Sequence, residues 1–112
     1  MRIPWEDDLI IDERTYTIHI GKIPDYLKLY QAEGLEIQKK TLGNLIGYFV
    51  TEIGTLSTVV HLWAYDSMED RAQRRATLAK DPAWQAYLAK MQPLVTAMEN
   101  RILAPTSFSP LR

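Results

Sequence analysis

The sequence predicts a single α+β domain, and three observations lead to this prediction. The chain has 112 residues, a length that favours one domain around one hydrophobic core. Its residues are 46% hydrophobic and 24% charged, which is typical of globular proteins. Segments that alternate with period two and segments with helical spacing follow one another, without a linker or an internal repeat between them.

Composition and charge also exclude several functions. The net charge is -1 and no basic stripe is present, so binding to nucleic acid is not expected. The chain has no run of about 20 apolar residues and does not begin like a signal peptide, so no membrane association is expected. It contains no cysteine, which excludes disulfides, thiolate catalysis and cysteine-bound zinc. We therefore expect a soluble, cytoplasmic protein without a cofactor.

The first half of the chain predicts a strand followed by a helix. Residues 9–20 alternate, so we expect a strand with two distinct faces. One face would carry Arg14, Tyr16, Ile18 and Ile20, and the other Glu13, Thr15, Thr17 and His19. From Pro24 to about Lys40 apolar residues recur at helical spacing, which predicts a helix with Gly34 as its weak point.

Two further strands are expected at residues 44–54 and 59–67, where they would form a hairpin. The second of them is read from the segment VVHLWAYDS. Its side chains divide into a ring-bearing face with His61, Trp63 and Tyr65 and a small aliphatic face with Val60, Leu62 and Ala64. Neither face resembles a solvated surface, so both should be covered.

The last third predicts two helical segments and a final strand. Ser67, followed three residues later by Asp70, indicates a capping box, and Asp81 before Pro82 indicates a second helix start. A helical stripe is expected to run through Trp84, Tyr87, Leu88, Met91, Leu94, Val95 and Met98, with a kink at Pro93. Residues 101–106 would form a short edge strand that contains Pro105, and residues 107–112 a tail.

The expected order is strand, helix, strand, strand, helix, strand, which is that of a ferredoxin-like antiparallel sheet with helices on one face. The other face of the sheet would then remain an apolar patch that pairs with a second chain. We expect His61, Trp63 and Tyr65 to face the helices, and Val60, Leu62 and Ala64 to face the partner.

Several blocks of the sequence resemble the NIPSNAP family of the dimeric α+β barrel class. They are ERTYTIHIGK, GNLIGYFVTEIG, VVHLWAYDSMEDRAQRRATLAKDPAW and ENRILAPTSFSPL. The resemblance covers residues 9–112 as a single NIPSNAP-like domain and leaves residues 1–8 as an N-terminal extension. It implies a ferredoxin-like subunit and a homodimer whose two sheets face each other. The activity of the family is poorly defined, so the resemblance supplies no reaction.

Enzymes of this barrel class generally work in the cleft between a sheet and its own helices. The residues expected to line that cleft are His61 and Tyr16 as catalytic candidates, with Arg14, Tyr48, Trp63 and Tyr65 as ligand-binding candidates. Imidazole and phenol groups can transfer protons, and an arginine can hold a carboxylate. Two functions stay open: a small-molecule-binding or interaction module, or a metal-independent oxygenase or isomerase. Simple core packing of these residues is the alternative to both.

Other groups of residues carry weaker signals. His19, His61, Glu13 and Glu52 lack the spacing of a metal site, so no metal is expected. Arg71, Arg74 and Arg75 cluster on one predicted helix, where they would either bind an acidic group or form a solvated face. No hydrolase or nucleotide-binding motif is present.

Overall fold

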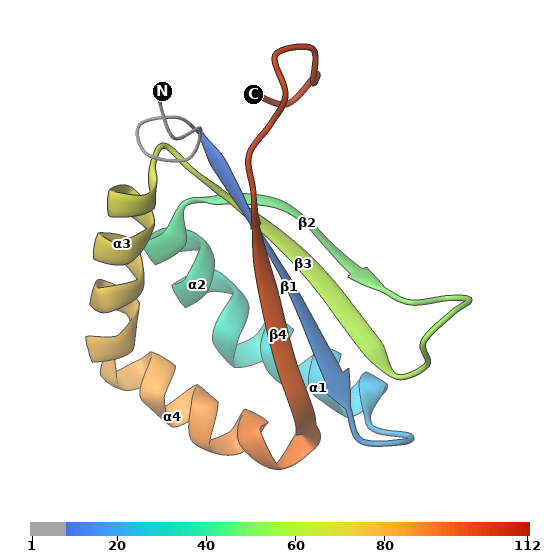
Figure 1. Ribbon diagram of the computed structural model, residues 1–112. Coiled ribbons are helices and arrows are strands. Elements are labelled where there is room, and N and C mark those ends of the chain that lie inside the picture. The colour runs from blue at the N-terminus through green and yellow to red at the C-terminus, as the bar shows by residue number, and fades with distance from the viewer. Residues whose placement is uncertain (1–8) are drawn as a thin grey trace.

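The computed structural model describes residues 9–112, and the extension expected at residues 1–8 lies outside this range. Within it, four strands form one antiparallel sheet in the order β2-β3-β1-β4 (Figure 1). The strands are β1 (Ile10–Ile18), β2 (Asn44–Val50), β3 (Thr58–Tyr65) and β4 (Val95–Leu103). This order confirms the predicted ferredoxin-like α+β fold.

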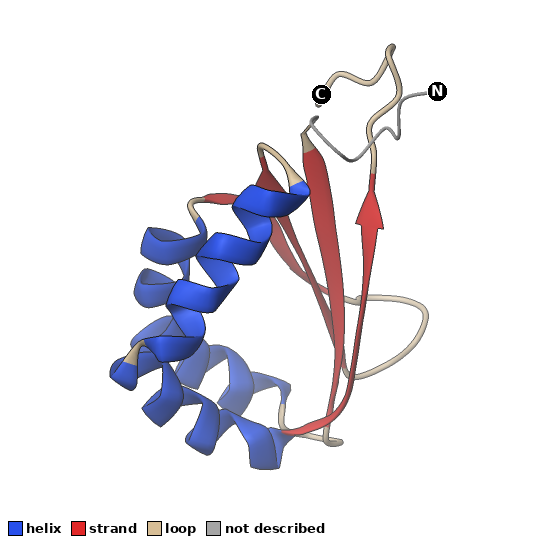
Figure 2. Ribbon diagram, turned by 60° about the vertical axis from the view of Figure 1, so that its left-hand side comes forward, coloured by secondary structure: helices blue, strands red, loops and turns tan. Residues whose placement is uncertain are grey.

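Among the described residues, the helices cover one face of the sheet and leave the other bare (Figure 2). They are α1 (Ile23–Leu29), α2 (Leu35–Leu42), α3 (Met68–Lys80) and α4 (Pro82–Met91). A π-helical turn, η1 (Tyr30–Gly34), joins α1 to α2, so the predicted first helix is interrupted at its expected weak point. A Cβ atom at Gly34 would lie 2.9 Å from the Tyr30 ring and 3.0 Å from the Tyr87 ring. Glycine here lets α4 pack closely against η1.

Both predicted helix starts are confirmed. The Ser67 hydroxyl accepts a hydrogen bond from the backbone N–H of Asp70 (3.0 Å) at the start of α3. The Asp81 carboxylate accepts two, from the N–H groups of Ala83 (2.8 Å) and Trp84 (3.3 Å), at the start of α4. These bonds satisfy donors that have no partner within the helix itself.

The boundary between α4 and β4 was predicted wrongly. The helix ends at Met91, a 3-10 turn, η2 (Gln92–Leu94), follows, and the strand begins at Val95 rather than at residue 101. Pro93 therefore lies in the turn and kinks no helix, and Pro105 lies beyond the strand. The reason is tertiary: β4 pairs with β1 over its length, for example Met98 opposite Tyr16, and this ladder overrides the helical spacing of the side chains.

Two other strand ends also differ from the prediction. β1 stops at Ile18, so Ile20 lies outside the sheet and is 94% exposed instead of sharing the face of Arg14. β2 stops at Val50 and does not extend to residue 54. A bulge lies in β2, where Leu45 and Gly47 pair with consecutive residues of β3, whereas the β1–β3 ladder is regular.

The two faces of β3 are oriented as predicted with respect to the helices. His61, Trp63 and Tyr65 are at most 2% exposed and face the helical layer, where the main core lies. Val60 and Leu62 lie on the bare face and are half-buried in the single chain. Phe49, which pairs with Val60 from β2, is 56% exposed on that face.

Candidate functional site

Strand register places four polar or aromatic side chains in one row across the helix-facing side of the sheet. Tyr48 of β2 is opposite His61 of β3, His61 is opposite Arg14 of β1, and Arg14 is opposite Asn100 of β4. Opposite residues in antiparallel strands have neighbouring side chains on the same face. Residues that are far apart in the sequence therefore meet in the middle of the sheet.

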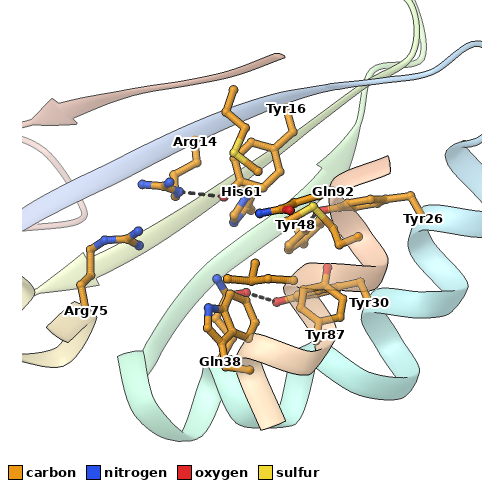
Figure 3. A pocket seen from close by; sticks show the side chains of 14 residues that line it. Arg14, Tyr16, Tyr26, Tyr30, Gln38, Tyr48, His61, Arg75, Tyr87 and Gln92 are labelled. Carbon is orange, nitrogen blue, oxygen red and sulfur yellow. Dashed lines mark hydrogen bonds between the residues drawn. The ribbon is translucent and has the colours of Figure 1, made fainter. Parts of the chain in front are cut away.

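A cavity of about 280 Å³ lies between this row and the helices (Figure 3). Five of the six tyrosines of the chain line it, together with two arginines and, among residues 9–112, no acidic residue. The lining residues are Arg14, Tyr16, Tyr26, Tyr30, Gln38, Tyr48, His61, Arg75, Trp84, Tyr87, Leu88, Met91, Gln92 and Met98. Mostly aromatic walls with a few polar groups are typical of small-molecule sites.

His61 is held in one tautomer by Trp63. Its Nδ1 atom accepts a hydrogen bond from the indole Nε1 of Trp63 (2.7 Å), and an indole N–H can only donate. The neutral imidazole must therefore carry its proton on Nε2. That atom is buried and has no hydrogen-bond partner among residues 9–112. His61 thus carries an unpaired, buried N–H donor, and the residue lines the cavity.

Burial also keeps His61 neutral. Desolvation, followed by the positive charge of Arg14, lowers the pKa of His61 to about 3, although Asp12 opposes the shift. With Nδ1 occupied and Nε2 protonated, the neutral ring is arranged to donate a hydrogen bond from Nε2, not to accept a proton there.

Aromatic rings hold the imidazole in place. The Tyr48 ring stacks on His61 with centroids 4.4 Å apart and planes 16° apart, and the Tyr16 ring meets it edge-on at 4.7 Å. The Tyr48 hydroxyl is 2.6 Å from that of Tyr26, and the Tyr30 hydroxyl donates to Gln38. Burial raises the pKa of Tyr26 to about 12 and raises that of Tyr48 further. These phenols therefore remain protonated at neutral pH.

Asp12 anchors the arginine in the row. Its fully buried carboxylate accepts hydrogen bonds from Arg14 (3.3 Å), Arg71 (3.0 Å) and Asn100 (3.0 Å). Burial alone would raise the pKa of Asp12, but the bond from Asn100 and the two arginines outweigh it and lower the pKa. Arg14 also donates from Nε to the Tyr16 hydroxyl (3.0 Å). The position of the Arg14 guanidinium is therefore well defined.

Arg75 is the second cation at the cavity. It is half-buried on α3 and lies on the same side of the cavity as Arg14 (Figure 3). Within residues 9–112 it makes no hydrogen bond or ion pair, whereas Arg71 contacts Asp12 and Arg74 contacts Asp70. Burial, followed by the charge of Arg14, lowers the pKa of Arg75.

The structure brings together four of the six predicted site residues. Arg14, Tyr16, Tyr48 and His61 line the cavity. Trp63 and Tyr65 also face the helices but do not line the cavity. Trp63 is fully buried and donates a hydrogen bond to His61. The two therefore lie deeper than expected for ligand-binding groups.

Sequence reasoning missed other parts of the cavity wall. Arg75 was grouped with Arg71 and Arg74 on a predicted helix, and helical spacing alone cannot show which of the three turns inward. Met98 was assigned to a helical stripe but reaches the cavity from β4. Tyr87 belongs to the same stripe, which could have been a surface for a flat ligand but whose helical spacing favoured core. Tyr26 and Tyr30 could have been found only from the number of tyrosines.

The acidic and histidine residues considered as metal ligands do not lie close together. Glu13 lies on the face of β1 opposite to Arg14 and pairs with Arg101 (2.7 Å), whereas His61 lies in the core. In the part of the chain that the structure describes, no three His, Asp or Glu side chains are placed to share a metal ion. No helix within residues 9–112 is long and apolar enough to cross a membrane.

The fold and the cavity together define the class of protein: a ferredoxin-like α+β domain with an aromatic cavity between its sheet and its helices. The family model described as NIPSNAP matches residues 11–110. The chain therefore belongs to the NIPSNAP family, which confirms the resemblance found in the sequence.

Individual relatives agree with this assignment. A solved NIPSNAP family protein from Agrobacterium tumefaciens is 54% identical with a TM-score of 0.92, covering 96% of this chain and 94% of that one. A second from the same organism, described as having unknown function, is 47% identical with a TM-score of 0.91, covering 95% and 96%. A zebrafish (Danio rerio) NipSnap homolog 1 is 37% identical over 98% of this chain but only 39% of its own length. The chain thus spans well under half of the curated relatives it matches.

More distant structures share the fold alone. A cofactor-independent oxygenase from Streptomyces nogalater superposes with a TM-score of 0.62 at 11% sequence identity, covering 93% of this chain and 97% of that one. At such identity the likeness carries no information about substrate or reaction.

Proposed function

We propose that this protein binds a small planar organic molecule in the cavity between its sheet and helices. The unpaired Nε2–H of His61 carries this proposal. Protein interiors seldom leave a buried N–H without a partner, and they contain few voids larger than a water molecule. A buried donor at a cavity of about 280 Å³ lined by aromatic rings therefore favours a ligand that fills the space and accepts the bond.

A neutral planar probe tests the cavity itself. Naphthalene-2-carboxamide is expected to bind the full chain and to shift the NMR resonance of the Trp63 indole N–H, because that group is bonded to His61. Leu88→Trp, which fills the cavity from α4, should abolish binding, whereas Ala89→Trp at an exposed position of the same helix should not. Equal binding by the two variants would place the probe elsewhere and refute the proposed site.

We further propose that the protein works as a homodimer through the bare face of its sheet. Phe49 is 56% exposed there, beside the half-buried Val60 and Leu62. An apolar group of this kind on β2 and β3 of an uncovered sheet suits a second copy of the same face, because a two-fold interface is self-complementary. The sheets would then pack about 10 Å apart, a distance that small aliphatic side chains allow.

Leu62→Asp is expected to dissociate the dimer, since it places a charge in the centre of the proposed interface. Light scattering should give twice the chain mass of 12.9 kDa for the unchanged protein and a single chain mass for the variant. Ala76→Asp, on the exposed side of α3, is the control and should stay dimeric. Circular dichroism should show that both variants are folded. A monomeric unchanged protein would contradict the proposal.

Chemical turnover in the same cavity is the second candidate function, as a metal-independent oxygenase or isomerase. His61 and Tyr16 both line the cavity, and an imidazole N–H and a phenol hydroxyl are donors that can stabilise an oxyanion formed during a reaction. In this proposal His61 and Tyr16 are the catalytic residues. Consumption of the ligand by the unchanged protein, but not by His61→Gln, would support it.

The cytoplasmic location expected from the sequence also stays a prediction.

A further inference from the structure

Among residues 9–112, the charged groups that line the cavity are all positive. They are two arginines, and no carboxylate of these residues lines it. The nearest buried carboxylate, Asp12, is shared between Arg14 and Arg71 and already accepts three hydrogen bonds. Within residues 9–112 no acidic group pairs with Arg75. A half-buried guanidinium beside another cation is costly without an anion to compensate it.

Arg14 still has donors available to such an anion. A guanidinium carries five N–H groups, of which Arg14 uses one on Tyr16 and one on Asp12. Because Nε donates to Tyr16, the N–H groups of Arg14 that residues 9–112 leave unused are on the terminal nitrogens. Arg75 retains all of its donors with respect to the described residues. Figure 3 shows the two guanidinium groups on the same side of the cavity, with His61 beside Arg14.

His61 adds a neutral donor to this pair of cations. Its proton is fixed on Nε2 by the indole of Trp63, so it can donate to an anion without becoming charged itself. Much of the remaining wall is aromatic: Trp84 and Tyr87 of α4 have ring centroids 5.0 Å apart, and the Tyr30 ring stacks on Tyr48 at 4.7 Å. A wall of flat rings suits a flat ligand.

We propose that the ligand of this cavity is the anion of a planar organic acid, whose carboxylate is bound by Arg14, Arg75 and the Nε2–H of His61. This inference rests on the function proposed above and names the chemical class of the ligand. Trp63 acts as a positioning residue, because it sets the tautomer of His61 and touches no ligand.

Paired isosteric probes test the inference by calorimetry on the full chain. Naphthalene-2-carboxylate should bind about tenfold more tightly than naphthalene-2-carboxamide, since charge-assisted hydrogen bonds are stronger than neutral ones. Arg75→Met should remove most of this preference, because it should weaken binding of the carboxylate and leave binding of the carboxamide unchanged. Arg74→Met is the matched control: this neighbour pairs with Asp70, does not line the cavity and should leave the preference unchanged.

The outcomes separate this inference from the proposed function. Equal binding of the acid and the amide would overturn the inference and leave the cavity as a ligand site. A preference that survives in Arg75→Met but is lost in Arg74→Met would overturn it as well, because general surface charge would then be responsible. If neither the acid nor the amide binds, both proposals are overturned.

The tautomer gives an independent readout of the positioning role. Nitrogen-15 NMR of the unchanged protein should show the His61 proton on Nε2. In Trp63→Phe the proton should be shared between Nδ1 and Nε2, and binding of the carboxylate should weaken. A proton found on Nδ1 in the unchanged protein would refute the assigned donor.

Discussion

Asp12→Asn is expected to lower the free energy of unfolding by about 3 kcal/mol, because it leaves two arginines without their shared counter-ion. The Asp12 side chain is fully buried, and those of Arg14 and Arg71 are only 13% and 20% exposed. Breaking one side of a buried ion pair costs far more than the pair contributes, since the remaining charge stays desolvated. Urea denaturation at pH 7.5 and a fixed protein concentration measures the loss.

Glu13→Gln is the matched control for this prediction. Glu13 is the next residue of β1, but it lies on the opposite face and pairs with Arg101, which is 69% exposed. Exposed pairs contribute about 1 kcal/mol or less, so the control should lose little stability. Similar losses for the two variants would mean that the buried network has no special weight.

Acid is expected to destabilise the protein through His61, by about 1.4 kcal/mol for each pH unit below 6.5. Burial and the charge of Arg14 lower the pKa of His61 to about 3 in the folded protein, whereas a histidine in an unfolded chain titrates near 6.5. Between these values the unfolded chain binds a proton that the folded protein does not bind. The stability is therefore complete above pH 6.5 and is lost progressively as the pH falls toward 3.

Urea titrations at pH 7.5, 5.5 and 4.5 test this slope. His61→Gln cannot titrate and should flatten it, whereas His19→Gln, at an exposed position after β1, should keep it. The lowered pKa of Asp12 acts elsewhere, since its contribution is present above about 3.8 and disappears only below that value. An unchanged slope in His61→Gln would show that the imidazole is not kept neutral by burial.

The elements with strong local signals were predicted correctly. Asp81 with Pro82, and Ser67 with Asp70, give helix starts that depend on hydrogen bonds within three residues, so no distant contact can move them far. The alternation in β3 depends only on strand geometry and separates His61 from Val60 and Leu62, and the large ring of His61 indicated the helix-facing side. The end of α4 could not be predicted, because Val95 and Met98 fit a helical stripe equally well and pairing with β1 decided the outcome.

The sequence by itself determined the fold class, through local periodicity and capping, and the family, through its resemblance. It also indicated four residues of the cavity: Arg14, Tyr16 and His61 lie on strands with clear alternation, and Tyr48 on a strand rich in aromatic and aliphatic residues. Only the tertiary structure decided the rest. Strand register aligned those residues in one row, and the orientation of α3 turned Arg75 toward the cavity. The tautomer of His61 likewise depends on its contact with Trp63. Register, helix orientation and side-chain hydrogen bonds arise from packing between distant segments, which no single stretch of sequence encodes.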